Sequence, residues 1–374
     1  VNGNPYGARV ANYGDSYVYA LNTNMDLTFK IMKGLTLSVQ GAANYSHVPS
    51  YSFTSSLAKP GQISGMENAS RMNLFWQNTN NVTYNTSFGD HHLTATAVFE
   101  ASGAEGRNLK LTGSDLANEF VGYWNAKNAK TRDGENGYSA EAIVSGLGRI
   151  MYNYKGKYML TGTFRADGSS RFAPKYRWGK FPSVAAAWIV SEEDFLRESN
   201  IFTFLKLRGG WGKTGNAYVG EYGWRTLYEN ADYENQPATR PSQIGNDRLK
   251  WEATEQVDLA LDFGFLPNQR ISGTLGFYKK KTDGLLYAYT MALSTGLETT
   301  QINFANIENK GIEFEIKANI IDNKDWNWFV GFNIGKNKNK ITDIDAEYVS
   351  YPGSSYLGNT VIQEGKSLGL IYGV

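Results

Sequence analysis

The sequence predicts an all-β protein, and more specifically a transmembrane antiparallel β-barrel. Three observations lead to this fold class. Apolar and polar residues alternate with a period of two, the alternating segments are long, and short turns alternate with long polar connections.

The alternation is clearest in residues 256–265, 312–320 and 19–31. In residues 256–265, Val257, Leu259, Leu261, Phe263 and Phe265 occupy every second position, and mostly polar residues separate them. Only a strand sends successive side chains to opposite faces. We count about twelve such segments, most of them about 10–15 residues long, whereas soluble strands have about 5–6 residues and tilted membrane strands about 9–11.

Short and long connections alternate along the chain. Tight turns are expected at residues 32–34, 89–90, 155–156, 267–269 and 322–325. Long polar loops are expected at residues 46–71, 103–137, 167–180, 215–250 and 284–310. Outer-membrane barrels have short periplasmic turns and longer extracellular loops. Residues 190–202 form a longer connection on the turn side, in which Ser191 is expected to be the N-cap of a helix.

A soluble β-sandwich would also alternate, with its apolar face in the interior. Aromatic residues near the expected turns favour the barrel, because aromatics collect at membrane interfaces. These residues are Tyr152, Tyr154, Tyr158, Trp326 and Trp328. In a barrel the apolar face meets outer-membrane lipid and the polar face lines a wet lumen.

Composition excludes several other classes of protein. The 37 basic and 36 acidic residues nearly cancel, so a basic face for nucleic acid is not indicated. The absence of Cys excludes disulfides and thiolate metal sites. No apolar run approaches the roughly 18 residues of a spanning helix. Aromatic residues make up 14% of the chain, which argues against disorder.

Short sequence patterns that resemble cofactor-binding, catalytic or metal sites occur in the chain, but each lacks a feature that its function requires. Residues 210–215 match GxGxxG, but no helix follows to receive a pyrophosphate, and these glycines are expected to let a strand end bend into a loop. Residues 365–369 match GxSxG, yet every histidine precedes them. His91 and His92 are neighbours on an expected strand and would point to opposite faces. We expect no catalytic residues, no cofactor and no metal site.

The chain starts at Val1 without a Met or a signal peptide, and it stops just after a strand-like stretch at residues 368–372. We therefore expect an internal piece of a longer protein.

Several motifs in a fixed order resemble the SusC/RagA family of TonB-linked outer-membrane transporters of Bacteroidetes-type bacteria. They are residues 167–172 (DGSSRF), 177–183 (RWGKFPS), 205–216 (LKLRGGWGKTGN), 249–256 (LKWEATEQ), 278–286 (YKKKTDGLL) and 307–314 (IENKGIEF). The resemblance is strong over residues 141–340 and weaker over residues 1–140.

The resemblance implies a barrel of about 22 strands with an N-terminal plug, energised through TonB, with a SusD-like surface lipoprotein as a lid. It implies import of an oligosaccharide or oligopeptide. The chain departs from this pattern, because residues 1–374 would form a portion of the C-terminal barrel domain without the plug or the final strands. A passive porin and a soluble or surface carbohydrate-binding or adhesin protein remain alternatives.

The expected site residues fall into two groups. Candidates for the lumen-facing wall, which could also contact the missing plug, are Arg149, Arg165, Arg208, Asp258 and Glu313, together with Asp26, Lys30, Lys206 and Lys317. Candidates for contact with substrate or lid are the loop aromatics Tyr123, Trp124, Tyr222, Trp224, Tyr228, Tyr233 and Tyr287. Aromatic rings suit stacking on sugars, burial against a partner protein, or packing within the loops.

Overall fold

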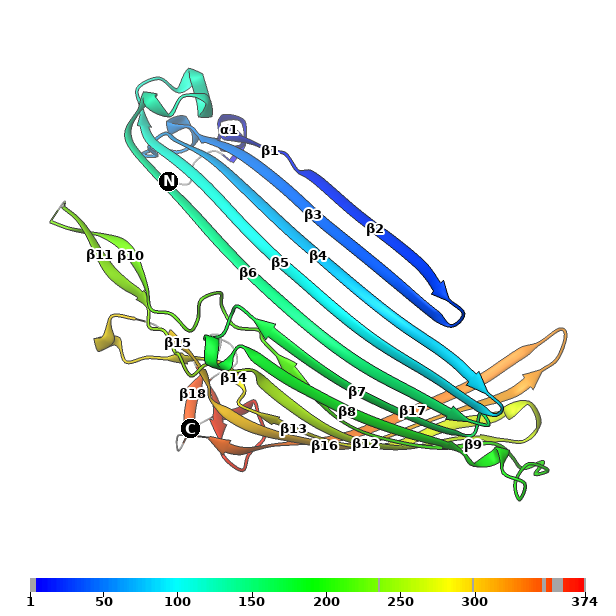
Figure 1. The fold of residues 1–374 in the computed structure, drawn as a ribbon. Helices are drawn as coiled ribbons and strands as arrows, with labels where there is room; N and C mark the ends of the chain where they lie inside the picture. The colour runs from blue at the N-terminus through cyan, green and yellow to red at the C-terminus, as the bar shows by residue number, and fades with distance from the viewer. Residues whose placement is uncertain (1–4, 235, 298, 345–347, 352–358, 373–374) are drawn as a thin grey trace. The chain divides into compact units, whose positions relative to one another are not determined.

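The computed structural model describes residues 5–234, 236–297, 299–344, 348–351 and 359–372. Within these ranges, one large antiparallel sheet contains thirteen strands (Figure 1). None of the described helices is both long enough and apolar enough to cross a membrane.

The strand order is β1-β3-β4-β5-β6-β7-β8-β9-β12-β13-β16-β17, with β2 also paired to β3. Because β1 and β2 are successive segments along β3, the thirteen strands occupy about twelve positions, which confirms the expected number. Their bounds are β1 Tyr13–Ser16, β2 Tyr19–Met32, β3 Leu35–Thr54, β4 Gly65–Phe88, β5 His91–Leu116, β6 Ala129–Tyr154, β7 Tyr158–Ser169, β8 Trp178–Ile189, β9 Phe202–Asn216, β12 Glu252–Phe265, β13 Ile271–Asp283, β16 Ala305–Asp322 and β17 Asn327–Ile344.

Smaller elements lie in the connections. Two hairpins are β10 (Leu227–Tyr233) with β11 (Gln236–Gln243) and β14 (Leu286–Thr290) with β15 (Thr299–Asn303) among the described residues. A separate sheet joins β18 (Tyr348–Tyr351), β19 (Asn359–Gln363) and β20 (Leu370–Tyr372). The helices are α1 Pro5–Ala11 and the short 3-10 turns η1 Ser56–Ala58, η2 Glu119–Trp124, η3 Ala126–Asn128, η4 Pro174–Tyr176, η5 Val190–Glu192, η6 Pro267–Gln269 and η7 Leu293–Thr295.

The chain divides into two compact units. The first comprises Val1–Thr28, Ser38–Asn80 and Glu100–Ile143, and the second comprises Phe29–Leu37, Asn81–Phe99 and Val144–Val374. In the first unit a small core forms around Phe53, Met66, Leu116, Tyr123 and Ala129. The second unit has two such cores, one around Phe172, Val219 and Leu249, and one that includes Phe304, Ile307 and Ile341.

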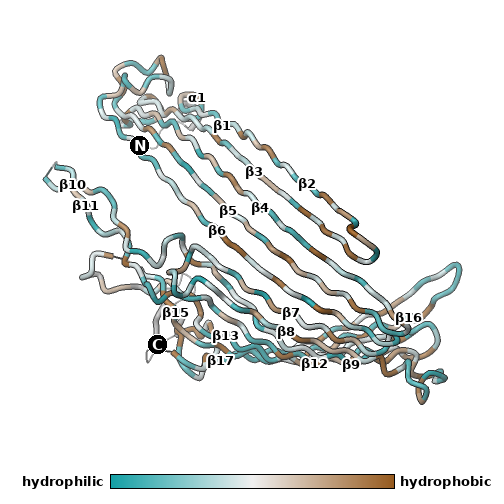
Figure 2. The backbone as a smooth tube through the Cα atoms, viewed as in Figure 1, coloured by the Kyte–Doolittle hydropathy of each residue, from teal (hydrophilic) through white to brown (hydrophobic). Residues whose placement is uncertain are grey.

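The large sheet leaves its apolar face uncovered. Strand pairing aligns Leu261, Leu275, Phe314 and Ile334 side by side across β12, β13, β16 and β17. On the same face Leu259 is 60% exposed and Val257 44% exposed. A sandwich would bury these residues between two sheets, so the soluble sandwich alternative is wrong for this region. Figure 2 shows hydrophobic and hydrophilic residues alternating along the strands.

The expected tight turns are confirmed at 32–34, 89–90, 155–156 and 267–269, and the turn expected at 322–325 lies at 323–326. The expected strand length was too short for several strands. β3 has 20 residues, β4 has 24, β5 and β6 have 26 each, and β16 and β17 have 18 each.

The extra length comes from segments expected to be loops. The connections left between strands are residues 55–64 and 117–128 rather than 46–71 and 103–137. The many polar residues in these segments suggested loops. The segments are instead polar extensions of the strands, in which ion pairs connect neighbouring strands. Lys110 Nζ lies 3.3 Å from Glu67 Oε2 and 3.9 Å from Glu135 Oε1, so these contacts join β4, β5 and β6.

Two further expectations were wrong in the second unit. Ser191 is not a helix N-cap, because it lies inside η5, whose N-cap is Ile189, and Glu193 begins a single turn with Arg197. The glycines of residues 210–215 do not bend a strand end into a loop. β9 continues through them to Asn216, and Gly215 leaves room for the rings of Phe181 and Trp251.

We predict that Gly215→Ala destabilises the barrel by about 1–3 kcal/mol, because overpacking a filled site forces its neighbours to move. A Cβ at Gly215 would lie 2.1 Å from Phe181 Cζ and 3.0 Å from Trp251 Cε3. The measurement is the temperature at which the folded band disappears in heat-modifiability gels of the detergent-purified protein. Gly162→Ala on β7 is the matched control, since a Cβ there meets nothing within 4 Å. Equal melting of both variants would contradict the packing argument.

Candidate functional site

A polar face is shared by β9, β12, β13 and β16. Pairing aligns Arg208 with Ala260, Gly276 and Glu313 across these four strands, and Asp258 lies two residues from Ala260 on the same face. Because Ala260 and Gly276 have small side chains, the face is hollowed there. The hollow has a volume of about 730 Å³, and Arg208, Asp258 and Glu313 are among its lining residues.

An ion pair orders the charges on this face. Arg208 Nε lies 2.9 Å from Asp262 Oδ2, and Arg208 Nη2 donates to Oδ1 at 3.3 Å. Thr274 on β13 also donates to Asp262 Oδ1 at 2.9 Å. Two donors from neighbouring strands therefore fix the carboxylate. Sequence reasoning omitted Asp262 from the wall, although it has the same strand parity as Asp258.

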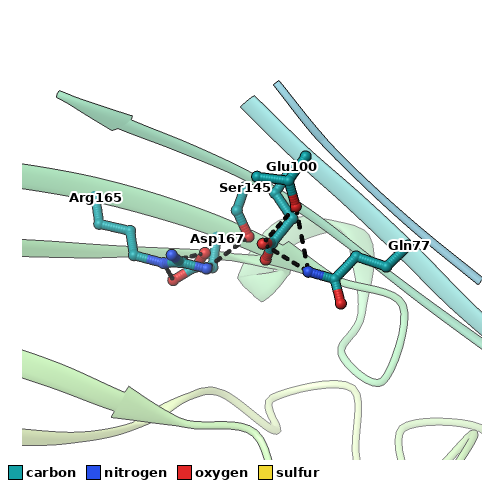
Figure 3. Close-up of polar contacts among 6 residues, drawn as sticks. Gln77, Glu100, Ser145, Arg165 and Asp167 are labelled. Atoms are coloured by element: carbon teal, nitrogen blue, oxygen red, sulfur yellow. Dashed lines mark hydrogen bonds and ion pairs between the residues drawn. The ribbon is translucent and has the colours of Figure 1, made fainter. Parts of the chain in front are cut away.

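A second polar group lies on β6 and β7 in the same unit. Arg165 Nε donates to both Asp167 oxygens, at 2.8 and 2.9 Å, and its Nη2 donates to Ser145 Oγ at 3.0 Å (Figure 3). Arg149 Nε donates to Thr163 Oγ1 at 3.3 Å. Arg149 and Arg165 therefore each join β6 to β7 through a side-chain hydrogen bond, and Arg165 also binds Asp167 on its own strand.

The other wall candidates lie on strands of the sheet. Lys206 pairs with Asp262 in the register of β9 and β12, so it shares the face of Arg208. Lys317 on β16 lies 4.6 Å from the centre of the Phe329 ring. Asp26 and Lys30 lie on β2, where every residue is exposed.

In the first unit, Glu100 on β5 accepts hydrogen bonds from two β4 side chains. Gln77 Nε2 donates to Glu100 Oε2 at 3.0 Å (Figure 3), and Thr79 Oγ1 donates to the same oxygen at 3.1 Å. These groups were also missed, because single polar residues within long polar strands carry no distinctive spacing.

Motif residues 167–172 anchor the loops of the second unit. Phe172 is completely buried and packs against Trp251, with ring centres 5.2 Å apart. Arg171 Nη1 donates to the Val219 carbonyl at 2.6 Å, and Trp224 Nε1 donates to the Ser170 carbonyl at 3.4 Å. The motif therefore fixes the base of the connection between β9 and β12.

The structure separates the loop aromatics by exposure. Trp124 is 72% exposed, Tyr228 68% and Tyr233 70%, whereas Tyr123 is only 5% exposed. Those that pack within the loops are Tyr123, Tyr222, Trp224 and Tyr287, and the Tyr287 ring lies 5.0 Å from Phe304.

An aromatic cluster in the first unit surrounds Tyr123. Its ring centre lies 5.5 Å from those of Tyr13 and Tyr51 and 5.0 Å from that of Trp124. The Tyr123 hydroxyl donates to Asp15, and this hydrogen bond is the main reason why the pKa of Tyr123 is raised to about 12.

A carboxylate joins two connections of the same unit. Glu119 accepts from Ser55 Oγ at 2.6 Å and from the Ser56 N–H at 3.1 Å. The hydrogen bond from Ser55 is the largest cause that lowers the pKa of Glu119. This residue ties residues 55–64 to residues 117–128.

At the short-turn end of the second unit, Tyr154 and Tyr158 of the expected aromatics lie near the longer connection. Glu193 accepts from Tyr158 Oη at 2.6 Å and from Trp188 Nε1 at 3.0 Å, and the first of these is the largest cause that lowers the pKa of Glu193. Tyr154 and Tyr158 stack with ring centres 6.2 Å apart.

His91 and His92 do not converge. His91 Nδ1 lies 2.7 Å from Tyr152 Oη, whereas His92 Nδ1 lies 2.8 Å from Ser87 Oγ. Among the described residues, no group of three His, Cys, Asp or Glu side chains could hold a metal ion.

Comparison with known proteins identifies the fold family. The family model described as "TonB dependent receptor-like, beta-barrel" matches residues 1–364. The chain belongs to this family. Its members are receptors of the bacterial outer membrane, and the resemblance to SusC/RagA-type proteins is confirmed.

Curated relatives of this TonB-dependent receptor barrel are much longer. TonB-dependent receptor P39 of Formosa agariphila is 30% identical over 99% of the chain and 36% of the relative. TonB-dependent receptor SusC of Bacteroides thetaiotaomicron is 39% identical over 64% of the chain and 25% of the relative. The chain thus spans about a quarter to a third of the length of these relatives.

The structure described as the RagAB peptide transporter has the same barrel fold. It superposes with a TM-score of 0.87 at 24% identity, over 96% of this chain and 40% of that chain. The same assembly in an open-open state gives a TM-score of 0.82. These likenesses support the fold of the barrel segment.

We predict that Asp15→Asn lowers the pKa of Tyr123 from about 12 toward the ordinary tyrosine value of about 10. Because folding raises the pKa of Tyr123, the hydrogen bond to Asp15 contributes its full stabilisation below the ordinary tyrosine pKa. This stabilisation is lost as the pH rises through the pKa of the folded state. The measurement is tyrosinate absorbance, taken as the difference between each protein and its Tyr123→Phe counterpart. An unchanged titration in Asp15→Asn would contradict the assignment.

Proposed function

We propose that this chain forms part of the barrel wall of a TonB-energised outer-membrane importer for an oligosaccharide or oligopeptide. The observation that carries the proposal is the family match over residues 1–364. The relative called SusC and the structural neighbour called a peptide transporter support the same class of activity. In this role the polypeptide is a channel wall, and it has no catalytic task.

The two faces of the sheet support a wall function. The apolar face suits hydrocarbon, and the face of Arg208, Asp258 and Glu313 suits a water-filled lumen. Since Arg208 and Asp262 are paired, these two charges on this face compensate each other. A solute with many hydroxyl or amide groups could exchange hydrogen bonds with such a wall without a large electrostatic barrier.

The wall requires further strands. The described sheet ends at β17 on one side and at β1 and β2 on the other. Unpaired backbone groups would each cost several kcal/mol in hydrocarbon. We therefore propose that a longer protein supplies the remaining strands, the plug and the contact with TonB.

We predict that uptake by the full-length transporter stops when a protonophore collapses the proton-motive force. TonB-linked import depends on this energy, whereas passive diffusion through a porin does not. Uptake of labelled solute by cells is the measurement, after growth of a gene-deletion strain on glycans and peptides has identified the solute. Uptake of a small porin-permeant solute is the control. Continued import after collapse would contradict active transport and favour the porin.

We also propose that the exposed loop aromatics dock a SusD-like lipoprotein. Trp124 lies in η2, and Tyr228 and Tyr233 lie on β10. Tyr and Trp are frequent hot-spot residues, and truncating a true hot spot costs about 2 kcal/mol or more. The packed residues Trp224 and Tyr287 are better suited to holding the loops.

We predict that Trp124→Ala combined with Tyr228→Ala weakens co-purification of the lipoprotein by at least about tenfold while the barrel remains heat-stable. Trp224→Ala is the contrasting variant, because its ring packs and its indole N–H binds the Ser170 carbonyl. It should lower loop stability, measured by limited proteolysis. If the double variant retains the lipoprotein fully, neither Trp124 nor Tyr228 contributes to docking.

A further inference from the structure

A group of lysines lies on the apolar face of the large sheet, toward the ends of the strands that carry the long connections. Pairing aligns Val257, Lys279, Lys310 and Lys338 across β12, β13, β16 and β17. The next row toward the short turns contains Leu259, Phe277, Ile312 and Lys336. Directly paired residues share a face of the sheet, so the lysines border the apolar belt.

These rows enclose a groove with two chemically different parts. It has a volume of about 460 Å³, and Val257, Leu259, Phe277 and Ile312 supply its apolar part. The polar part consists of Lys279, Lys310, Lys336 and Lys338. All four apolar side chains are between 39% and 60% exposed, so the groove is open on the outer surface of the sheet.

The charges in the groove are not balanced locally. Lys279 Nζ lies 3.0 Å from Glu308 Oε2, and Lys310 Nζ lies 3.9 Å from Glu308 Oε1. One carboxylate therefore serves two ammonium groups. Lys336 and Lys338 are exposed and form no ion pair within the part of the chain that the structure describes.

The position of the lysines distinguishes them from solvated surface charges. Apolar residues recur at every second position from Val257 to Phe265, a distance of roughly 27 Å along the strand. At a tilt of about 40° this corresponds to about 20 Å across the membrane, close to the apolar band of about 25 Å in outer-membrane barrels. The lysines thus lie at the level where lipid headgroups begin, on the side of the long connections.

We propose that this groove binds a membrane lipid with a phosphate-bearing headgroup. An acyl chain would lie along Val257, Leu259, Phe277 and Ile312, and the phosphate would contact Lys310, Lys336 and Lys338. Phosphate oxygens accept several charge-assisted hydrogen bonds, and lysine is a flexible donor for them. Clustered lysines beside an apolar surface are the expected recognition elements for anionic lipid. The proposal concerns the outer surface and does not depend on transport through the lumen.

The test compares the wild-type full-length protein with a variant carrying Lys310→Gln, Lys336→Gln and Lys338→Gln. Dioleoyl phosphatidic acid is the probe, and dioleoyl phosphatidylcholine has the same acyl chains without the net charge. Retained lipid is counted by native mass spectrometry after titration in detergent. We expect phosphatidic acid to be preferred in the wild type and its affinity to fall by roughly tenfold to hundredfold in the variant. Added salt should weaken the preference, since exposed charges are screened.

The control variants separate local recognition from overall charge. Lys33→Gln, Lys155→Gln and Lys324→Gln remove three charges at or beside short turns, at the opposite strand ends, and should leave binding unchanged. Replacing Lys310, Lys336 and Lys338 by Arg should retain binding. Heat modifiability shows whether each variant is folded, and Lys338→Gln alone serves if the triple variant is not.

Several outcomes would overturn the proposal. Equal retention of phosphatidylcholine would mean that the groove accepts any acyl chain. Competition by inorganic phosphate alone would indicate a free-anion site. An equal loss in the turn-lysine control, or no loss in the groove variant, would show that these lysines do not recognise the headgroup.

Discussion

A strand that crosses hydrocarbon must pair every backbone N–H and C=O group with a neighbouring strand. The hydrophobic pattern and the geometry of the turns then select the register of that pairing. Once the register is fixed, the period of two assigns each side chain to one face. The pairing that aligns Leu261 with Leu275 and Phe314 also places Arg208 opposite Ala260, and Ala260 opposite Gly276. A single set of backbone hydrogen bonds therefore produces a lipid-compatible surface and a polar wall.

Sequence periodicity predicted the fold class and about twelve strand positions because the alternation of side chains is a local property of each strand. It underestimated β3 to β6, since polar residues such as Lys110, Glu67 and Glu135 resemble a loop until their pairing across strands is known. The residues that share the polar face of the sheet were predictable by parity, although Asp262 was left out of the list. The exposure of Tyr123 and Trp124 could not be predicted, because the difference depends on tertiary contacts with Tyr13 and Tyr51.

The motifs that make the family recognisable have a structural role in this chain. Phe172, Leu249 and Trp251 belong to one hydrophobic cluster at the base of the loops. Asp167 accepts a hydrogen bond from Arg165. Such residues must satisfy a fixed geometry for the loops to pack. This explains why the motifs identify the barrel family and carry no information on a substrate.

Trp124 and the hairpin tyrosines are exposed to a similar extent, but they differ in rigidity. The Trp124 ring is flanked by Tyr51 and Tyr123, and the neighbouring connection is tied down through Glu119. Tyr228 and Tyr233 project from a two-stranded ribbon, and an isolated hairpin of this kind is marginally stable. A partner meeting Trp124 would find an ordered shape and would lose little conformational entropy. A partner that binds the hairpin would have to order it on binding. The surface around Trp124 therefore suits a partner of complementary rigid shape, whereas the hairpin can adapt its shape to the partner.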